Sequence, residues 1–485
     1  MSLNSKDIAF NRFGYGRVFN QPDQEPSDPS EWLISQLKPL NLDSQLTGSY
    51  ASAINLSNSK EIIYQLGKFR QLTRRQQQSS SKSKKQNKKI SKDQSNMMAE
   101  GSPQDKIKQS RRMLTKNAYG LQAHTLNNAI TSNSGFQARL LDFFSNHFSV
   151  SATNINMRAL APTLEREAIA PYLSGYFANM LIAVEQHPAM LIYLNNVQSI
   201  GPRSTIGKRR GKGLNENLSR EILELHTLGV NGGYTQNDVR ELAMAITGWS
   251  VNYEGINNKT QSQRDAASDS FHFRDAAHEP GVRKILGKKY KQRNALQGVR
   301  ILQDLAVHPS TANYMSHKIA RHFIADDPDP DLVNAMSNAW LKTNGHIKSV
   351  LTVMIKHPAS WSVNAEKYKT PRDFLISCVR ACGPTKMADK QLLQSLKIMG
   401  QAPFNAGSPA GYDDTAETWN GPEALISRIE WVNKLSQAVN KSAIDIGETV
   451  IGESLTKQSR KIIQRAESRQ QAIALLLLSP EFLHR

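Results

Sequence analysis

Helical periodicity is the feature of this sequence that most constrains its fold. Apolar residues recur at intervals of three and four along most of the chain, whereas the apolar/polar alternation that marks half-buried strands is scarce. A chain of 485 residues can also bury a substantial core without help from a metal or a disulfide. We therefore predict a mainly α fold: a large multi-helical single domain with short irregular or small β loop segments.

One stretch departs from this pattern. Residues 73–105 contain almost no apolar side chain, so they cannot bury enough surface to offset the entropy lost on ordering. We predict that this stretch is flexible and belongs to a basic low-complexity insertion at residues 73–110, between an N-terminal helical part at residues 1–72 and a main helical domain at residues 111–485. The segment is read either as an electrostatic arm for an acidic partner or as a solvated loop.

The positive charge of the chain is concentrated in two places. Of the formal charge of +19, the stretch from Arg70 to Lys116 has 14 basic and three acidic residues, and the stretch from Arg203 to Lys212 has five basic residues. Because the remainder is almost neutral, a basic nucleic-acid groove built into the core is not expected. The insertion also lacks interleaved aromatic residues for base stacking, so nucleic acid is an unlikely partner.

Neither a membrane span nor a disulfide framework is expected. The longest apolar run, at residues 472–478, is far shorter than the ~20 residues that cross a bilayer. The first residues lack the apolar stretch of a signal peptide, so the default expectation is a cytoplasmic protein, with export alongside a partner left open. Cys378 and Cys382 lie four positions apart and are predicted to be buried thiols rather than a bridge.

Helix ends can be placed at three His-Pro pairs. Proline disfavours the helical conformation in the residue before it and suits the first turn of the next helix. His187, His308 and His357 each precede such a proline after an apolar helical stretch. We predict that these three histidines stand at helix ends rather than act as ligands.

Two further local structures are expected around residue 250. Thr235 and Asp238 have the spacing of a capping box at the start of a helix. Residues 250–290 lose the helical pattern, and we predict a short strand pair there, formed by residues 271–273 and 283–286.

The segment richest in residues that could take part in catalysis covers residues 213–229. Its apolar stripe is accompanied by a polar stripe that contains Glu221 and Glu224, beside an i, i+4 pair of Glu216 and Arg220. Two carboxylates on one helical face can bind a metal together or shift each other's pKa. We predict these four residues as catalytic, the alternative being a solvated ion-pair face.

Other candidate residues come from two distant segments. Asn146 and His147 end an aromatic helix, where polar side chains need partners if they are buried. His278 and Glu279 lie in a Gly/Pro loop, the kind of segment that often carries chemistry. Asn146 is predicted as a further catalytic residue, while a hydrogen-bonded core histidine remains the alternative for His147.

The candidates combine into one hypothetical cleft. Histidine and carboxylate ligands together suit Fe, Mn or Zn, so we predict a divalent metal held by His147, Glu221, Glu224 and His278. The basic residues just before the polar helix would form a rim that favours an acidic substrate. These rim residues are Arg209, Arg210 and Lys212.

Several segments together resemble the bacterial family catalogued as domain of unknown function 1800. The similarity covers most of the chain, except for the basic insertion, and departs from the usual family pattern at Asn195 and Glu279, where aspartate is usual. It is carried by NRFGYGR, FFSNHF, HPAMLIYLNN, GLNENLSREILELHTLGVNGGYTQNDV, TGW, HEPGVRKILG, HPSTA, GQAPFNAGSPAGY and LLLLSPEFLHR. The resemblance implies a mostly helical single-domain fold without an agreed reaction. It also implies a partner protein with a phosphatase/sulfatase-like fold, often exported.

Two functions follow as expectations. The first is an enzyme with a cleft of His, Glu, Asn and Arg, a metal-dependent oxidoreductase or hydrolase that acts on an acidic or polar substrate. The second is a non-catalytic binding or scaffold protein that engages a partner enzyme or an acidic polymer through its basic loops.

Overall fold

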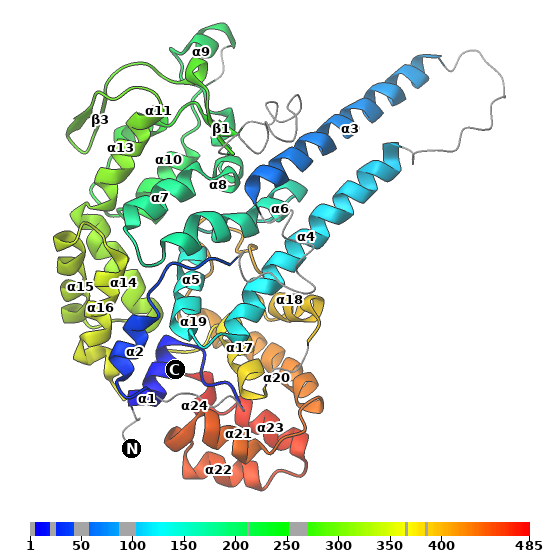
Figure 1. Cartoon of the computed structure of the whole chain (residues 1–485), viewed down its shortest axis with the longest axis vertical. Coiled ribbons are helices and arrows are strands. Elements are labelled where there is room, and N and C mark those ends of the chain that lie inside the picture. The colour runs from blue at the N-terminus through cyan, green and yellow to red at the C-terminus, as the bar shows by residue number, and fades with distance from the viewer. Residues whose placement is uncertain are drawn as a thin grey trace.

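Helices make up most of the computed structural model, as the periodicity predicts (Figure 1). The structure describes residues 5–19, 26–42, 58–86, 103–210, 213–251, 270–363, 367–383 and 387–485. Within these ranges the strands are four segments of three residues each, which confirms a mainly α single domain. In the described part of the chain, no helix has the length and apolar character needed to cross a membrane.

The N-terminal third forms part of the body of the molecule and a projecting arm. Its elements are α1 (Ser5–Ile8), η1 (Ala9–Phe13), α2 (Pro29–Ser35), α3 (Ser59–Gln86), α4 (Pro103–Thr131) and α5 (Gly135–His147). Helix α2 starts after Asp28, whose carboxylate accepts hydrogen bonds from the backbone N–H groups of Ser30 and Glu31.

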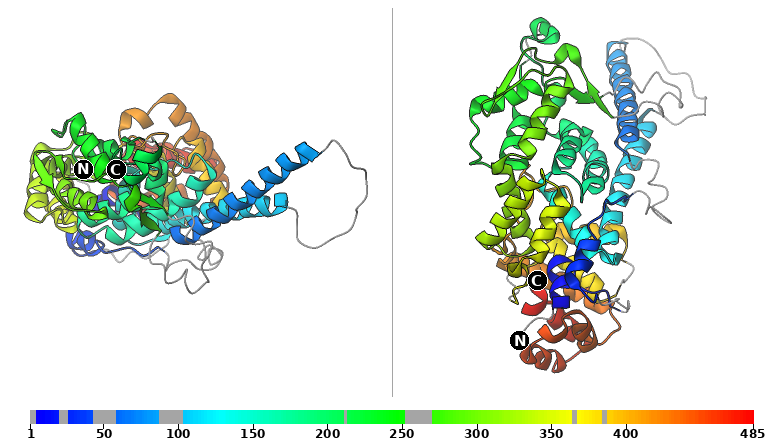
Figure 2. Two further views of the ribbon diagram at one scale, coloured as in Figure 1. Left: turned by 90° about the horizontal axis from the view of Figure 1, so that it is seen from above. Right: turned by 60° about the vertical axis from the view of Figure 1, so that its left-hand side comes forward.

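Helices α3 and α4 pack against each other and extend away from the body as an arm (Figures 1 and 2). At 1.5 Å per residue, the 28 residues of α3 cover about 42 Å. Residues 73–86 and 103–105 of the stretch that we expected to be flexible are therefore helical, while residues 87–102 lie outside the described residues. The physical reason is that glutamine, lysine and arginine are good helix formers even where little apolar surface is buried.

The middle of the chain forms a layer of short helices. Its elements are α6 (Ile155–Leu164), η4 (Glu165–Ile169), η5 (Ala170–Tyr172), α7 (Phe177–Gln186), α8 (Pro188–Tyr193), η6 (Asn196–Gln198), α9 (Thr205–Arg210), α10 (Asn217–Glu221), η7 (Ile222–His226) and α11 (Gln236–Ala245). Both η4 and η7 are π-helical turns. The predicted capping box is present, because Thr235 accepts from the backbone of Asp238 and the Asp238 carboxylate accepts from the backbone of Thr235.

Two small antiparallel sheets follow. They comprise β1 (Trp249–Val251), β2 (Phe271–Phe273), β3 (Arg283–Ile285) and β4 (Lys288–Tyr290), with the short helix η8 (Asp275–Ala277) between β2 and β3. The two predicted strands exist, but they do not pair with each other: β2 pairs with β1, and β3 pairs with β4. The β3–β4 connection is a two-residue hairpin turn, Leu286 and Gly287, both at positive φ, and this local closure is favoured over a distant pairing.

The last part of the chain is again helical. Its elements are α13 (Ala295–Ala306), α14 (Pro309–Phe323), α15 (Pro330–Lys342), α16 (Ile347–Lys356), η9 (Pro358–Trp361), α17 (Pro371–Ala381), α18 (Asp389–Ile398), α19 (Ala416–Trp419), α20 (Pro422–Gln437), α21 (Ala443–Val450), η10 (Gly452–Ser454), α22 (Lys457–Gln464), α23 (Arg469–Leu477) and α24 (Pro480–Leu483). Cys378 and Cys382 are buried free thiols at α17, as expected.

The three His-Pro histidines do stand at helix ends, and their role is specific. His187, His308 and His357 are the N-cap residues of the helices that follow, and each accepts a hydrogen bond at Nδ1 from the backbone N–H two residues ahead, at 3.1–3.3 Å. An acceptor Nδ1 requires an unprotonated nitrogen, so in this arrangement each histidine caps as the neutral tautomer with its proton on Nε2.

The hydrophobic core has two parts that meet at α4 and α5. The larger part gathers side chains between Ile8 and Ile355, and the smaller gathers the C-terminal helices around Phe374 and Trp431. Both α4 and α5 contribute residues to each part, for example Leu140 to the larger and Ala138 to the smaller. The seam between the two parts is where buried charged residues gather.

Candidate active site

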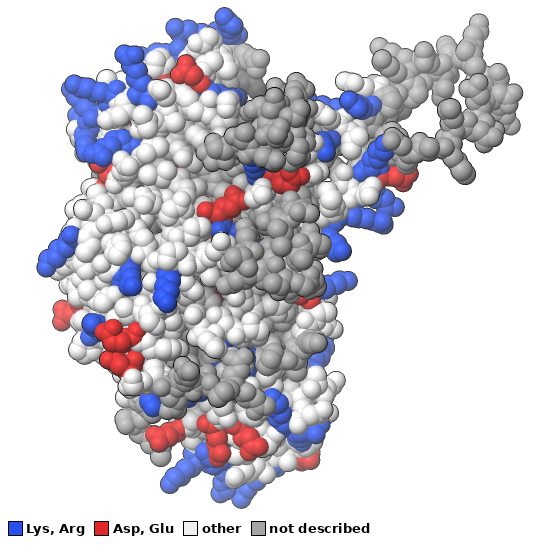
Figure 3. Space-filling view, viewed as in Figure 1, with Lys and Arg blue, Asp and Glu red and all other residues white. Residues whose placement is uncertain are grey.

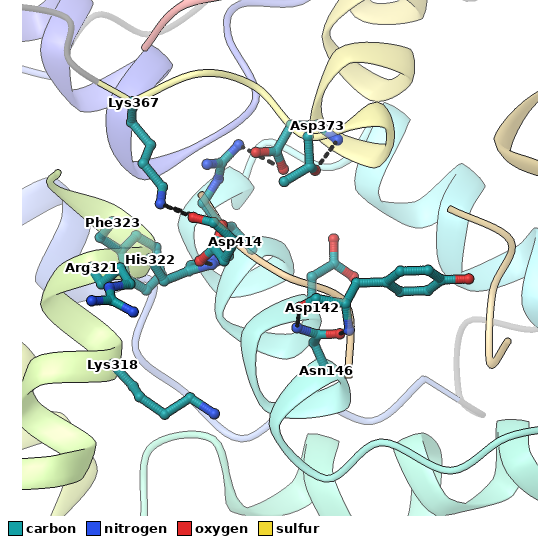
Figure 4. Close-up of polar contacts among 12 residues, drawn as sticks. Asp142, Asn146, Lys318, Arg321, His322, Phe323, Lys367, Asp373 and Asp414 are labelled. Atoms are coloured by element: carbon teal, nitrogen blue, oxygen red, sulfur yellow. Dashed lines mark hydrogen bonds and ion pairs between the residues drawn. The ribbon is translucent and has the colours of Figure 1, made fainter. Parts of the chain in front are cut away.

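A small cavity of about 100 Å³ lies at this seam. It is bordered by α4, α5, η4, α14, α17 and the segment 401–414, so five helices and one irregular segment from distant parts of the sequence meet there. Figure 4 shows side chains of α5, α14 and α17, together with Lys367, around Asp414. The polar residues of its lining used below are Asp142, Ser145, Asn146, Glu165, His322, Arg372, Asp373 and Asp414.

The central pair of the cavity is His322 and Asp414. The His322 Nδ1 atom lies 2.7 Å from Asp414 Oδ2, and the imidazole side chain is only 12% exposed. The other ring nitrogen, Nε2, is buried without a hydrogen-bond partner among the described residues. A carboxylate on Nδ1 fixes the proton there and leaves Nε2 as a proton acceptor, the arrangement of a histidine general base.

The protonation states of the pair follow from burial and charge. Burial lowers the pKa of His322 below its ordinary value, and Asp414 opposes this shift. Burial alone would raise the pKa of Asp414, but His322, Lys367 and Arg485 lower it to about 2. At neutral pH the pair is therefore a neutral imidazole beside an ionised carboxylate.

Asp414 is held in place by a lysine anchor. The Lys367 ammonium lies 2.5 Å from Asp326 Oδ1 and 3.6 Å from Asp414 Oδ1, and it also donates to the Asp414 backbone carbonyl. With its side chain 1% exposed, Lys367 needs both carboxylates to balance its charge. It therefore orients the carboxylate that orients His322.

Glu165 also lines the cavity, and its pKa is shifted in the direction opposite to that of His322. Burial raises the pKa of its carboxyl group above the ordinary value, while Arg372 opposes the shift. Its Oε2 accepts a hydrogen bond from Ser145 at 3.0 Å. A carboxyl group with a raised pKa is a better candidate for a proton donor than an ordinary glutamate, so the pKa values of the two groups are shifted toward separate roles as base and acid.

The wall of the cavity is a network of buried ion pairs. The Asp373 carboxylate lies 3.1 Å from Arg139 Nη2 and 3.3 Å from Arg485 Nε, and all three side chains are at most 5% exposed. Arg372 Nη2 donates to Asp142 Oδ1 at 2.7 Å. These pairs join α5, α17 and the end of the chain, so they fix the two parts of the core against each other.

Asn146 is the one predicted catalytic residue that lines this cavity, but its amide is occupied. Its Nδ2 donates to the Tyr412 carbonyl and its Oδ1 accepts from the Tyr412 N–H, both at 2.8 Å. A Cβ at Gly411 would come within 2.4 Å of the Asn146 carbonyl oxygen, so the backbone here approaches as closely as glycine permits. Asn146 therefore positions the segment that carries Asp414.

Replacing Asn146 with alanine is expected to lower the free energy of unfolding by about 1–3 kcal/mol, because two buried backbone groups of Tyr412 lose their partner. The segment 401–414 should also become more sensitive to limited proteolysis. Asn433→Ala, an exposed asparagine on α20, is the matched control for helix propensity. Equal stability and equal cleavage rates in the two variants would contradict the positioning role.

The polar helix at residues 213–229 lies elsewhere and is mostly a network of ion pairs. Arg220 contacts Glu224 at 3.2 Å and Glu216 at 3.9 Å, and Gln236 donates to Glu216. Burial raises the pKa of Glu221, which His226 opposes. None of these residues lines the cavity, so this geometry resembles the solvated ion-pair alternative rather than a cleft.

The winding of the helix changes just before His226. Residues Ile222–His226 form a π-helical turn rather than a continuation of α10. A π-helix brings residues five apart onto one face, so His226 and Glu221 influence each other's charge. His226 is fully buried and its Nδ1 lies 2.7 Å from Glu185 Oε1.

The remaining predicted residues are structural or peripheral. His147 is buried beside Lys318 Nζ, 3.2 Å from its Nδ1, and its Nε2 lies 3.2 Å from the His226 carbonyl oxygen. His278 Nδ1 lies 3.0 Å from the Thr247 carbonyl oxygen. Glu279 is buried and accepts two hydrogen bonds from Arg203, one from its backbone and one from its side chain.

The expected metal ligands do not come together. Among the described residues, no group of three or more His, Cys, Asp and Glu side chains is placed to hold a metal ion, so His147, Glu221, Glu224 and His278 form no such centre. The predicted substrate rim can be placed only in part. Arg209 is exposed on α9, whereas the side chain of Arg210 and all of Lys212 lie outside the described residues.

Sequence reasoning missed His322, Asp414 and Glu165. His322 ends α14 in the sequence HKIARHF, which shows no motif spacing, and Asp414 follows 92 residues later. One available signal was the pair Asp413–Asp414 directly after GQAPFNAGSPAGY, a segment already identified as resembling the family. An acidic pair in an irregular segment on a helical scaffold is a typical place for functional residues.

Comparison with known proteins places the chain in one family. No curated protein and no solved structure matches it. A sequence profile described as "Protein of unknown function (DUF1800)" matches residues 8–484, nearly the whole length. This span includes α5, α14 and the segment 401–414, which together build the cavity. The chain therefore belongs to the DUF1800 family.

Proposed function

We propose that the chain is an acid–base hydrolase of an anionic substrate, with its active site in the cavity at the seam. The observation that carries the proposal is the His322–Asp414 pair, whose second ring nitrogen has no partner among the described residues although it is buried. Buried polar atoms are usually satisfied, and an unsatisfied one at a cavity wall calls for an explanation. A water or substrate group that gives up a proton there would satisfy it.

The proposed chemistry assigns one role to each side of the cavity. His322 Nε2 takes a proton from a water molecule, Asp414 stabilises the imidazolium that forms, and the hydroxide attacks the substrate. Glu165, whose pKa is raised by burial, gives its proton to the leaving group. The two proton transfers use only water and the side chains of His322 and Glu165, so no other reactant is needed.

The pH dependence of this mechanism has a defined sign. The base must be neutral, and the pKa of His322 lies below its ordinary 6.5; the acid must be protonated, and the pKa of Glu165 lies above its ordinary 4.5. The profile of kcat/KM should therefore be bell-shaped, with its maximum on the acidic side of neutrality. Glu165→Gln should remove the alkaline limb, and a profile that still rises above pH 8 would contradict the assignment.

A screen of hydrolysis on acidic peptides, esters and glycosides tests the proposal, with the His322→Gln variant as the blank. Turnover by the natural chain that is lost in the variant supports it, and equal turnover in both contradicts it. A second measurement needs no substrate. The ¹⁵N resonances of His322 at pH 7 should show a neutral ring with its proton on Nδ1, and a doubly protonated ring would overturn the role of a base.

A further inference from the structure

A second and larger hollow adjoins the cavity. It is an open groove of about 1150 Å³ between α4, α6, α18 and the segment 401–405. Gln122, Pro403 and Asn405 line both the groove and the cavity, so these three residues form their common border. A molecule bound in the groove would therefore lie next to the cavity that His322 lines.

The groove is strongly basic. Asp389 is its one acidic lining residue, whereas seven lining residues are basic, namely Lys108, Arg111, Arg112, Lys116, Arg158, Lys390 and Lys397. None of the seven forms an ion pair within the described part of the chain. Figure 3 shows Lys and Arg side chains along the stretch where α4 leaves the body. The basic charge at residues 108–116 therefore belongs to a long helix that borders a groove.

The spacing of the charges indicates the shape of the ligand. Lys108, Arg112 and Lys116 follow each other at intervals of four, so they lie on one face of α4 about 6 Å apart along its axis. In an extended peptide, side chains on the same face repeat every ~6.6 Å. Alternate carboxylates of such a peptide would therefore meet successive cations.

We propose that the groove binds an extended acidic peptide segment, with alternate Asp or Glu side chains against the cations of α4 and α18. Its apolar side chains would pack on Met113 and Tyr119, which are 40% and 54% exposed in the same groove. That this peptide is also the substrate rests on the proposed function; its binding does not. Nucleic acid is the less suitable ligand, because Tyr119 is the one aromatic residue of the lining and single strands need successive stacking platforms.

The test is direct binding of a fluorescent 16-residue peptide of alternating Glu and Thr, measured by anisotropy at two salt concentrations. Binding should weaken markedly as salt rises, because exposed charges are screened. The variant Arg112→Glu/Lys116→Glu should lose about ten-fold or more in affinity. Lys461→Glu/Arg465→Glu makes the same charge change at the same spacing around α22, outside the groove, and should keep nearly full affinity.

The possible results separate the groove from the active site. Equal losses in the two double variants, or no binding by the natural chain, would overturn the groove assignment. Tighter binding of single-stranded DNA or polygalacturonate, with displacement of the peptide, would overturn the choice of a peptide. A peptide with the same number of Glu and Thr residues, but with all the Glu residues consecutive, should bind more weakly. If His322→Gln binds the peptide normally but no chain hydrolyses it, the groove stands and the proposed catalysis fails.

Discussion

Replacing His322 with glutamine should reduce kcat by about 10²–10⁴-fold on any substrate that the natural chain hydrolyses, the usual contribution of a positioned general base. Glutamine retains a planar amide close to the size of the ring, so the cavity should stay filled. It cannot accept the proton that Nε2 takes. Because the substrate would still bind, KM should change much less than kcat.

The control for this experiment is His317→Gln on the same helix. His317 is half-buried, and burial lowers its pKa as it does for His322, but it does not line the cavity. This variant should retain nearly full activity. Asp414→Asn should approach the loss seen in His322→Gln, because the imidazole would lose its orientation and its favoured tautomer. Comparable activity of His317→Gln and His322→Gln would contradict the role of His322.

Replacing Asp373 with asparagine should lower the free energy of unfolding by about 3–5 kcal/mol, measured by urea denaturation at pH 7. The carboxylate balances two buried guanidinium groups, those of Arg139 and Arg485. Burial raises the pKa of Asp373, but these two arginines lower it overall. An asparagine would remove the carboxylate that pairs with Arg139 and one of the two carboxylates that act on Arg485, which costs far more than the loss of one hydrogen bond.

The same substitution should change how stability depends on pH. A carboxylate with a depressed folded pKa contributes stability that is fully present above its unfolded pKa, near 3.8 for aspartate, and lost as the pH falls through the folded pKa. Asp373→Asn should remove this part of the loss of stability at low pH. The part that comes from Asp414, whose pKa is about 2, should remain.

Asp331→Asn is the matched control for Asp373→Asn. Asp331 also lies in the first turn of a helix, α15, but it is exposed and has no ion pair in the described part of the chain. Its substitution should change stability by no more than about 0.5 kcal/mol. If the two variants differ by less than 1 kcal/mol, the buried network does not hold the seam together. An insoluble Asp373→Asn beside a soluble Asp331→Asn would agree with the prediction.

The features that the sequence allowed us to predict were those set by neighbouring residues. The helical class, the capping box at Thr235 and the helix-end positions of His187, His308 and His357 all depend on spacings of two to four residues. The predicted pairing of β2 with β3 was wrong, because β2 pairs with β1 and β3 pairs with β4. A three-residue strand carries too little pattern to reveal its partner.

The candidate site could not be predicted for a different physical reason. Glu221 and Glu224 were selected because they are close in sequence, whereas the cavity is built from residues such as Asp142, Glu165, His322 and Asp414, which only the packing of the helices brings together. Asn146 was found through its position in an aromatic helix, but its role depends on Tyr412, 266 residues away. Long-range polar contacts leave no periodic signal in a single sequence.

The π-helical turn at Ile222–His226 marks a point at which this chain can lose one residue without turning the rest of the segment. Such a turn holds one residue more than the α-helix that it interrupts, and Thr227 Oγ1 here donates to the Ile222 carbonyl, five positions back. Removing one residue from the turn would restore regular helical winding. The side chains after it would keep their present direction, because the deletion takes out only the residue that the wider turn accommodates. A variant one residue shorter at this point should therefore keep its helix content and still place a histidine against Glu185.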